Sequence, residues 1–390
     1  MPSDASPWRV LIIAEKYPPD VGGLAVATAR NAHGLAAAGL EVHVLTVTSA
    51  APPGVMETER EGAVPVHRLG ALRQADETLQ MAGDMIELLQ QRHGFHLLHG
   101  FYVLQAGFLA VLQAQRLGLK AVVSVRGNDL DRSLYQGSAF GPLHWTLARA
   151  DAVACVSADL RRWVEALTGR RDVQETPNAV DGTVFQPRPP EGERRRALFP
   201  QEEDPTAPIL GSVGELRFKK GLHILLETFR RVRQRRPARL LLVGGARRAE
   251  REFLRNFLDR HRELQPEVQL VPYVQDRAEL AAYYHLMEVV LFPSLWEGMP
   301  NALLEAMACG RVVVASDAGG IKQVLRHGEN GALLSRHQLE HLADLTLEVF
   351  ALPEATRAQW GRQARADMLT HFTPERETAR LLEIYRQLTG

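Results

Sequence analysis

The sequence predicts an α/β protein built from two doubly wound, Rossmann-like domains. The first observation is that short runs of apolar and β-branched residues alternate with longer amphipathic segments along most of the chain. Strands separated by helices favour a parallel sheet covered on both faces, because parallel neighbours need crossover connections. The second observation is that this alternation stops in a stretch rich in proline and charge and then resumes. The third is length, because 390 residues exceed the size at which one hydrophobic core usually stops growing.

The first domain is expected to span residues 1–183. Its β-branched apolar runs, such as EVHVLTV, are typical of strands in a buried parallel sheet. The expected strands are 8–14, 41–47, 64–69, 95–100, 120–125 and 151–157, and the expected helices are 24–39, 75–92, 103–117, 138–149 and 158–168. Residues 49–62 and 126–138 show no such pattern, so we expect irregular loops there.

Residues 184–208 are expected to form a linker, because a segment so rich in proline and charge buries too little apolar surface to join a sheet. The second domain is expected to span residues 209–373. Its expected strands are 208–214, 238–245, 267–273, 288–294 and 311–316, and its expected helices are 220–235, 248–263, 277–285 and 300–309. The chain from about 336 is polar and helical, and Thr373 followed by Pro374 is typical of a helix start.

Composition excludes several classes of protein. Lys plus Arg equals Asp plus Glu, so no net field draws the chain to nucleic acid. No stretch approaches the ~18 uncharged apolar residues of a membrane span, and the N-terminus lacks a signal-peptide pattern. Cys155 and Cys309 lie in apolar segments and indicate no disulfide framework. We expect a cytoplasmic protein without a nucleic-acid partner. The arginine-rich segment 229–239 is expected to be a solvated helix face, with contact to anionic lipid at the inner membrane face as the alternative.

The segment SLWEGMPNALLEAMACG places Glu297 and Glu305 on either side of a helix start. The pattern predicts a strand, a loop and a helix, with Asn301 as a cap and Gly310 as the stop. A helix start offers unpaired N–H groups and the positive end of the macrodipole, which favour phosphate. Carboxylates do not hold phosphate, but they accept hydrogen bonds from hydroxyls. The arrangement therefore suits a ligand with phosphate between two polyols, such as a sugar nucleotide.

The longer segment EGMPNALLEAMACGRVVVASDAGG resembles the glutamate–seven–glutamate signature of the retaining glycosyltransferases of family 4, which have the two-domain GT-B fold. The resemblance implies that Glu297 binds hydroxyls of the donor sugar and that Glu305 holds the ribose. The alternative is that both are solvated helix-end charges. In this fold the domains face each other across a cleft, and the last helix, 374–390, crosses back to the first domain. The backbone expected to hold the diphosphate comprises Gly298, Met299, Pro300, Asn301, Ala302 and Leu303.

A basic segment in the second domain, GSVGELRFKKG, resembles the family's loop that normally reads VGRLVPEKG. By that resemblance Lys220 neutralises the donor diphosphate. Glu215 stands where the family has an arginine, and we expect Arg217, close by, to supply that cation instead. Groups that neutralise a leaving diphosphate in a closed site contribute several kcal/mol. The nucleotide base is expected to contact the chain at Tyr273 and Val274.

In the first domain, PPDVGGLAV resembles the family's N-terminal glycine loop. Gly22 and Gly23 would allow the backbone to approach the donor phosphates or the acceptor. The segment SVRGNDL falls where many members carry a histidine, and Arg126 stands at that position as a permanent cation suited to phosphate or carboxylate. A packed histidine with satisfied hydrogen bonds is the alternative for His99. The expected acceptor or sugar contacts are Arg126, Asn128, Asp129 and His99.

The resemblance implies an enzyme that moves a sugar from a UDP- or GDP-sugar to an acceptor hydroxyl, with retention of configuration. The acceptor is a glycan, a lipid-linked molecule or a small molecule. The expected catalytic residues are Glu297, Lys220 and Arg217; no protein nucleophile is marked out, so the leaving diphosphate takes the acceptor's proton. We expect no cofactor beyond the nucleotide sugar. We also expect no protein metal site, because the histidines show no metal-binding spacing.

Two other functions share the expected fold: a sugar-nucleotide epimerase and a nucleotide-sugar binding protein without catalysis. The second is motivated by Glu215 and Arg126, which stand where the family has other residues. A phosphorylase would need a lysine for pyridoxal phosphate, and no strand-end lysine is marked out. A dinucleotide dehydrogenase would need G-x-G-x-x-G after its first strand, and PPDVGGLAV lacks it. The donor sugar, base, acceptor identity and oligomeric state are not indicated.

Overall fold

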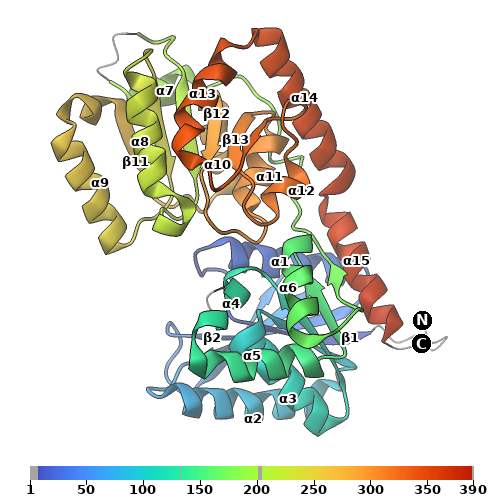
Figure 1. The fold of residues 1–390 in the computed structure, drawn as a ribbon. Helices are drawn as coiled ribbons and strands as arrows, with labels where there is room; N and C mark the ends of the chain where they lie inside the picture. The colour runs from blue at the N-terminus through green and yellow to red at the C-terminus, as the bar shows by residue number, and fades with distance from the viewer. Residues whose placement is uncertain (1–7, 132, 201–203, 389–390) are drawn as a thin grey trace. The chain divides into compact units, whose positions relative to one another are not determined.

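The structure, a computed structural model, describes residues 8–131, 133–200 and 204–388. It divides into two compact units (Figure 1). Unit 1 comprises Met1–Asn178 and Pro374–Gly390, and unit 2 comprises Ala179–Thr373. Each unit has its own mostly parallel sheet and its own apolar core. The predicted class, α/β with two Rossmann-like domains, is therefore confirmed.

Unit 1 forms a sheet of eight strands among its described residues, in the order β3-β4-β2-β1-β5-β6-β7-β8. Every neighbouring pair is parallel except β3 and β4. The strands are β1 (Arg9–Ala14), β2 (Glu41–Thr48), β3 (Met56–Glu61), β4 (Val64–Gly70), β5 (Leu97–Phe101), β6 (Lys120–Val125), β7 (Ala152–Cys155) and β8 (Gln174–Glu175). The α-helices are α1 (Gly23–Ala37), α2 (Ala75–His93), α3 (Phe108–Leu117), α4 (Asn128–Asp131), α5 (Gly137–Arg149), α6 (Ala158–Thr168) and α15 (Pro374–Gln387).

The expectation of an irregular loop at 49–62 was wrong for its second half. β3 pairs antiparallel with β4 at the edge of the sheet, and Gly62, at φ 62°, turns the chain between them. The strand reads METERE and is largely exposed, so it lacks the apolar alternation that marks a half-buried strand. Charged residues on an edge strand are a common protection against pairing with other chains.

Unit 2 forms a sheet of six parallel strands among its described residues, in the order β11-β10-β9-β12-β13-β14. The strands are β9 (Ile209–Val213), β10 (Arg239–Val243), β11 (Val268–Val271), β12 (Val289–Phe292), β13 (Val312–Ser316) and β14 (Ala332–Leu334). The α-helices are α7 (Gly192–Leu198), α8 (Leu222–Arg233), α9 (Arg248–Arg260), α10 (Arg277–Leu286), α11 (Asn301–Ala308), α12 (Ile321–Val324), α13 (Leu342–Ala351) and α14 (Glu354–His371).

The segment expected to be a linker, 184–208, belongs to unit 2 and contains α7. Phe185 and Phe199 anchor it, because each is at most 2% exposed. Much of the proline and charge that predicted a linker lies between these two aromatic residues. Two buried phenylalanines are enough to attach a segment whose average composition is polar.

In both sheets the order in which successive strands are added reverses at a central strand, and this switch point is where doubly wound sheets bind ligands. In unit 1 the chain proceeds from β1 through β2 and returns on the other side of β1 with β5. In unit 2 it proceeds from β9 through β10 and returns beside β9 with β12. Ligands of doubly wound sheets bind outside the carboxyl ends of the strands at this switch point. The loops after β1 and β5, and those after β9 and β12, are therefore the candidate positions.

The last helix, α15, completes the core of unit 1. Leu381, Ile384 and Tyr385 are each 1% exposed and pack with residues of β1 and β2. Glu377 on the same helix pairs with Arg30 on α1 at 2.6 Å. Helix α15 is thus part of the unit that contains β1, although it is the last element in the sequence.

No helix within the described residues is long and apolar enough to cross a membrane. The arginines expected to form a solvated or lipid-facing surface are largely engaged with acids of unit 2. Arg230 pairs with Glu227 at 2.6 Å, and Arg233 pairs with Glu267 at 2.6 Å. These pairs reduce the positive field that an anionic lipid would meet. Contact with a membrane stays a prediction.

Candidate functional site

Lys220 and Glu297 lie together at the switch point of unit 2. Lys220 ends a short 3-10 turn in the loop after β9, and Glu297 lies in the loop after β12. The Lys220 ammonium is 3.4 Å from Oε1 of Glu297, and the two side chains are 31% and 9% exposed. The Ser294 hydroxyl donates to the same oxygen at 3.2 Å. A solvent-accessible cation therefore lies beside a nearly buried carboxylate.

The backbone around Glu297 is held by the loop that follows β13. The Gly320 N–H donates to the Gly298 carbonyl at 2.7 Å. Gly319 has φ 54°, and a Cβ on it would collide with the carbonyl oxygen of Glu297. The close approach explains the paired glycines at the end of the VVVASDAGG run. The sequence motif included these glycines, but their role in fixing Glu297 was not predicted.

Arg217 lies in the same loop as Lys220 but is held by acidic side chains. Its guanidinium is 3.2 Å from Glu215 and 3.4 Å from Glu250, whose side chain is 8% exposed. Glu215 also pairs with Arg247 at 2.8 Å. Burial raises the pKa of Glu215, but Arg247 and Arg217 more than offset this and lower it. In this arrangement the charge of Arg217 is largely neutralised, whereas Lys220 faces Glu297.

Helix α11 begins directly after the Glu297 loop. Pro300 is its N-cap and no side chain caps it, so the first turn relies on other partners for its N–H groups. Among the six residues expected at the diphosphate, some backbone groups already have hydrogen-bond partners within unit 2. Leu303 N–H already donates to the Pro300 carbonyl at 3.2 Å, and the Gly298 carbonyl belongs to the glycine contact described above. Met299 is 4% exposed and packs inward.

Glu305 lies in α11 and is 3% exposed. Arg277 Nη2 donates to one carboxylate oxygen at 2.5 Å, and the Tyr284 hydroxyl donates to the other at 2.9 Å. Arg277 also stacks over the ring of Phe185, with 4.8 Å between guanidinium and centroid. Burial and the Glu305 charge raise the pKa of Tyr284 well above its ordinary value. Glu305 is therefore a fixed hydrogen-bond acceptor whose orientation is set by α10.

Arg277 and Tyr284 were missed by sequence reasoning, because they lie on α10, outside the motif that identified Glu305. Tyr273 and Val274, expected near the base, precede that helix. Tyr273 is 40% exposed and Val274 is 9% exposed. Burial lowers the pKa of Arg277, but Glu305 more than offsets this and raises it. Tyr273 adds a smaller contribution in the same upward direction. The exposed ring of Tyr273 thus lies within electrostatic range of the Arg277–Glu305 pair.

In unit 1, the expected glycine loop follows β1. Gly22 has φ 131°, which a residue with a side chain rarely adopts, and Gly23 begins α1. Glu15, the first residue after β1, was not predicted as a site residue. Burial, followed by repulsion from Asp129, raises the pKa of Glu15 to about 7. Its position at the carboxyl end of the first strand is the only sequence signal that would have identified it.

Asp129 follows β6 and is 1% exposed. Its carboxylate accepts hydrogen bonds from the Gly127 N–H at 2.7 Å and the Arg126 N–H at 3.0 Å. Burial nevertheless raises the pKa of Asp129 to about 6. Glu15 and Asp129 are thus two carboxyls whose pKa values are raised toward neutral pH, the range suited to proton transfer. Asn128 begins α4, but its side chain lies outside the described part of the structure.

Arg126 does not present a free cation as the sequence suggested. Its side chain is 7% exposed and lies 3.9 Å from Glu377. Its guanidinium also donates to the Asn178 side chain and lies over the Phe101 ring, at 5.7 Å. Burial, opposed by Glu377, lowers the pKa of Arg126 to about 10. An arginine so enclosed has its charge balanced within unit 1, so the structure does not support the predicted acceptor or sugar contact.

His99 also lies inside unit 1 rather than at a surface. It is 0% exposed, and both ring nitrogens have partners: the Tyr385 hydroxyl at 2.6 Å and the Ser124 hydroxyl at 2.9 Å. Burial, followed by the Arg126 charge, lowers the pKa of His99 to about 3, so the ring is neutral. This geometry favours the packed, satisfied histidine over a contact with acceptor or sugar.

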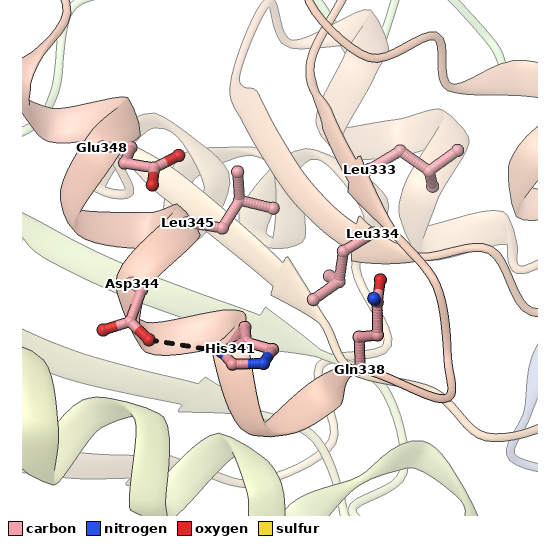
Figure 2. Close-up of a pocket in the computed structure, with 7 residues that line it drawn as sticks. All are labelled: Leu333, Leu334, Gln338, His341, Asp344, Leu345 and Glu348. Atoms are coloured by element: carbon pink, nitrogen blue, oxygen red, sulfur yellow. Dashed lines mark ion pairs between the residues drawn. The ribbon is translucent and has the colours of Figure 1, made fainter.

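A separate pocket of about 290 Å³ lies between β14 and α13 of unit 2 (Figure 2). Asp344 points toward His341 across one wall, at 3.7 Å. Leu333, Leu334 and Leu345 supply its apolar surface. No residue expected at the donor or acceptor lines this pocket, and the paired acidic and basic side chains on its wall are largely exposed. It provides no polar constellation that suggests a ligand.

Comparisons with known proteins agree with the geometry of both units. Two family models match: "Glycosyl transferase 4-like domain" over residues 22–179 and "Glycosyl transferases group 1" over residues 207–351. The chain is 26% identical over 378 residues to N-acetyl-alpha-D-glucosaminyl L-malate synthase of Bacillus anthracis, covering 94% of each chain. It is 28% identical over 369 residues to a D-inositol 3-phosphate glycosyltransferase of Pseudarthrobacter chlorophenolicus, covering 88% of this chain and 86% of the relative.

Solved structures show the same fold. A sucrose-phosphate synthase from Thermosynechococcus elongatus has a TM-score of 0.80 at 23% identity, over 98% of this chain and 99% of that one. The Anabaena protein HepE, solved in complex with UDP-glucose, has a TM-score of 0.77 at 17% identity, over 97% and 99% of the two chains. At these identities the structural likeness establishes the fold, and the family models carry the relationship.

Proposed function

We propose that the protein, which belongs to glycosyltransferase family 4, transfers a sugar from a nucleotide-diphosphate sugar to an acceptor hydroxyl with retention of the anomeric configuration. The observation that carries the proposal is the Lys220–Glu297 pair at the switch point of unit 2. The pair lies beside the start of α11, and Glu305 lies inside that helix. A cation, a helix start and two carboxylates meet the needs of a diphosphate flanked by two sugars.

Each group has a part that follows from its chemistry. Lys220 and the first turn of α11 hold the diphosphate, because both carry positive charge or its equivalent. Glu297 accepts hydrogen bonds from the transferred sugar, and Ser294 fixes the orientation of its carboxylate. Glu305 accepts hydrogen bonds from the ribose, since Arg277 and Tyr284 fix its carboxylate and leave lone pairs on both oxygens.

The reaction needs no protein nucleophile. The bond between the anomeric carbon and the diphosphate oxygen breaks, and the acceptor oxygen bonds to the same face of that carbon. The acceptor's proton passes to an oxygen of the departing diphosphate. Lys220 stabilises the negative charge that develops on the leaving group, an interaction that is strongest in the transition state. The protein therefore acts by positioning and electrostatic stabilisation.

The names of the relatives and structural neighbours support a choice of nucleotide for the donor and of chemical class for the acceptor. HepE was solved with UDP and with UDP-glucose, which supports a uridine nucleotide, with a GDP-sugar as the alternative. The two curated relatives are named for L-malate and for inositol 3-phosphate, both small hydroxylated anions. These names support a small-molecule acceptor over a glycan or a lipid-linked one.

A donor screen tests the proposal. Purified protein is mixed with a panel of UDP-, GDP- and ADP-sugars, and the shift in melting temperature and the release of nucleoside diphosphate are measured. We expect one nucleotide class to stabilise the protein and to be hydrolysed slowly without acceptor. Glu305→Ala should lose the stabilisation. Glu340→Ala, at a side chain that is 66% exposed in the same unit, should retain it.

Three outcomes would contradict the proposal. Absence of donor-dependent stabilisation at millimolar concentration would exclude the sugar nucleotide as ligand. Stabilisation without hydrolysis, and without transfer to any of a panel of hydroxylated small molecules, would favour a binding protein instead. Once a product is found, NMR coupling constants of its anomeric proton decide retention, and an inverted product would refute the proposed route.

A further inference from the structure

Three histidines of unit 1 converge toward the amino-terminal ends of the strands, the side of the sheet opposite the switch point. His43 lies near the start of β2, His67 lies on β4, and His93 ends α2. One ring nitrogen from each lies within 4.8 Å of the others. β2 and β4 are neighbouring parallel strands, and their register pairs Leu45 with His67. His43 and His67 therefore point to the same face of the sheet, two positions apart.

We propose that His43, His67 and His93 bind a divalent transition-metal ion of the zinc class. Neutral imidazole is a preferred ligand for zinc, and three histidines with an open fourth position form a known type of protein zinc site. The site is separate from the proposed donor site, because Lys220, Glu297 and Glu305 all belong to unit 2, whereas the three histidines belong to unit 1.

The geometry of the first two ligands fits an ion between them. Nδ1 of His43 is 2.9 Å from Nε2 of His67, so a single proton now lies between the two rings. Zinc–nitrogen bonds of about 2.0–2.1 Å at tetrahedral angles separate two ligand nitrogens by about 3.4 Å. A metal ion that replaces the shared proton therefore needs the rings to separate by about half an ångström. The shared proton then moves to an outward ring nitrogen, so that each imidazole keeps one N–H and stays neutral.

The outward nitrogens of these two rings already have suitable partners. Nε2 of His43 is 3.3 Å from a carboxylate oxygen of Glu41, and Nδ1 of His67 is 2.9 Å from the Thr58 hydroxyl. A ligating histidine usually donates its other N–H to a carboxylate, a carbonyl or a similar acceptor, which fixes the ring and its tautomer. With metal bound, His43 donates to Glu41 and His67 donates to Thr58.

His93 completes the set from a helix end. Its ring centroid is 4.3 Å from that of His43 and 6.2 Å from that of His67. As the last residue of α2 it is only half-buried, so its side chain has room to turn toward the other two. The C-terminus of a helix carries the negative end of the macrodipole, which favours a cation there.

The surroundings provide access and a balance of charge. A cavity of about 410 Å³ opens beside the three rings, and Thr58, Leu89 and Met56 contribute to its wall. Arg60 and Arg92 also line the cavity, but both are exposed and their repulsion is screened by solvent. Glu41 supplies the compensating negative charge.

Zinc binding tests the proposal. Full-length protein without a histidine tag is stripped with chelator and titrated with zinc chloride in competition with a chromophoric chelator. We expect one equivalent of zinc to bind. His93→Ala should weaken binding at least tenfold, and Glu41→Gln, which keeps all three ligands, should weaken it about 10-fold or more through loss of the outer hydrogen bond. His33→Ala, an exposed histidine on α1, should bind as the wild type does.

The melting temperature of each variant in EDTA shows that the metal-free protein is folded. Cobalt(II) in place of zinc should give the intense visible absorption of a tetrahedral site in the wild type, and His93→Ala should lose it. Equal zinc affinity for the wild type and His93→Ala would refute the site. So would failure of the wild type to bind zinc at micromolar concentration.

Discussion

Arg277 on α10 donates a hydrogen bond to Glu305 on α11, with 2.5 Å between Nη2 and Oε1. The carboxylate is 4% exposed and the guanidinium is 38% exposed, so the pair bridges the interior of unit 2 and its surface. Tyr284 holds the other oxygen of Glu305. The orientation of the carboxylate therefore depends on a residue outside the sequence motif that contains it.

Arg277→Met should destabilise unit 2 and weaken donor binding together. Removing one partner of a fully buried ion pair costs about 3–5 kcal/mol, and the partial exposure of Arg277 reduces this to about 1–3 kcal/mol. The melting temperature and the Kd of the donor identified by the screen measure the two effects. Arg277→Lys, which keeps a charge, should show a smaller loss of both, and Arg251→Met, on an exposed position of α9, should show neither. Unchanged donor affinity in Arg277→Met would show that Glu305, in the orientation set by Arg277, does not contact the donor.

Lys220 and Arg217 should differ in their effect on the reaction although both lie in one loop. Lys220 faces Glu297, whereas Arg217 is paired with Glu215 and Glu250. Lys220→Ala should lower kcat by about 100-fold or more, the effect of removing one preorganised charge from a transition state. Arg217→Ala should lower it by less than about 10-fold, because its charge is already neutralised. Steady-state kinetics with a saturating acceptor make the comparison, and equal losses would contradict the assignment.

Much of the fold was predictable because buried parallel strands are continuous apolar runs. The expected strand at 120–125 coincides with β6, and the expected helix at 158–168 coincides with α6. β3 could not be predicted, since an exposed edge strand has no apolar face to reveal it. The segment 184–208 was misread because average composition conceals two buried phenylalanines.

The candidate site was predictable only where its residues are consecutive. Glu297, Glu305 and Lys220 lie in motifs, and their local geometry follows from a loop and a helix start. Partners from other elements left no signal in the sequence, as the contact of Gly319 with the Glu297 backbone shows. The same reason explains His43, His67 and His93, which lie on two strands and a helix end. Spacing rules detect ligands on one element and miss those that a sheet brings together.

Arg126 was expected to contact a ligand, but it lies in a charge cluster around Glu377, so the prediction concerns the stability of unit 1. Glu377 is 2% exposed and accepts hydrogen bonds from Arg30 at 2.6 and 3.0 Å and from Asn31 at 3.1 Å, with Arg126 nearby. Glu377→Gln should lower the free energy of unfolding by about 3–5 kcal/mol, because the buried guanidinium of Arg126 and the partly buried one of Arg30 lose their counter-charge.

Denaturant unfolding measures this loss. The double variant Arg126→Gln with Glu377→Gln should recover part of the stability, since one of the uncompensated charges is then absent. Glu375→Gln, at an exposed position on the same helix, should have little effect. A Glu377→Gln protein as stable as the wild type would show that the cluster is not held by charge.

Glu15 should make unit 1 less stable as the pH rises toward neutrality. Its pKa is raised from 4.5 to about 7 by burial and by Asp129, so folding favours the protonated carboxyl. The stabilisation is fully present below pH 4.5, where both folded and unfolded chains are protonated at this group, and it is lost as the pH rises through about 7. Glu15→Gln keeps the shape and cannot ionise, so it should melt at a higher temperature than the wild type at pH 8 and at nearly the same temperature at pH 5. Glu57→Gln, on the exposed edge strand, should follow the wild type at both pH values. If Glu15→Gln and the wild type differ equally at pH 5 and pH 8, the carboxyl does not titrate in this range and cannot serve as a proton carrier near neutral pH.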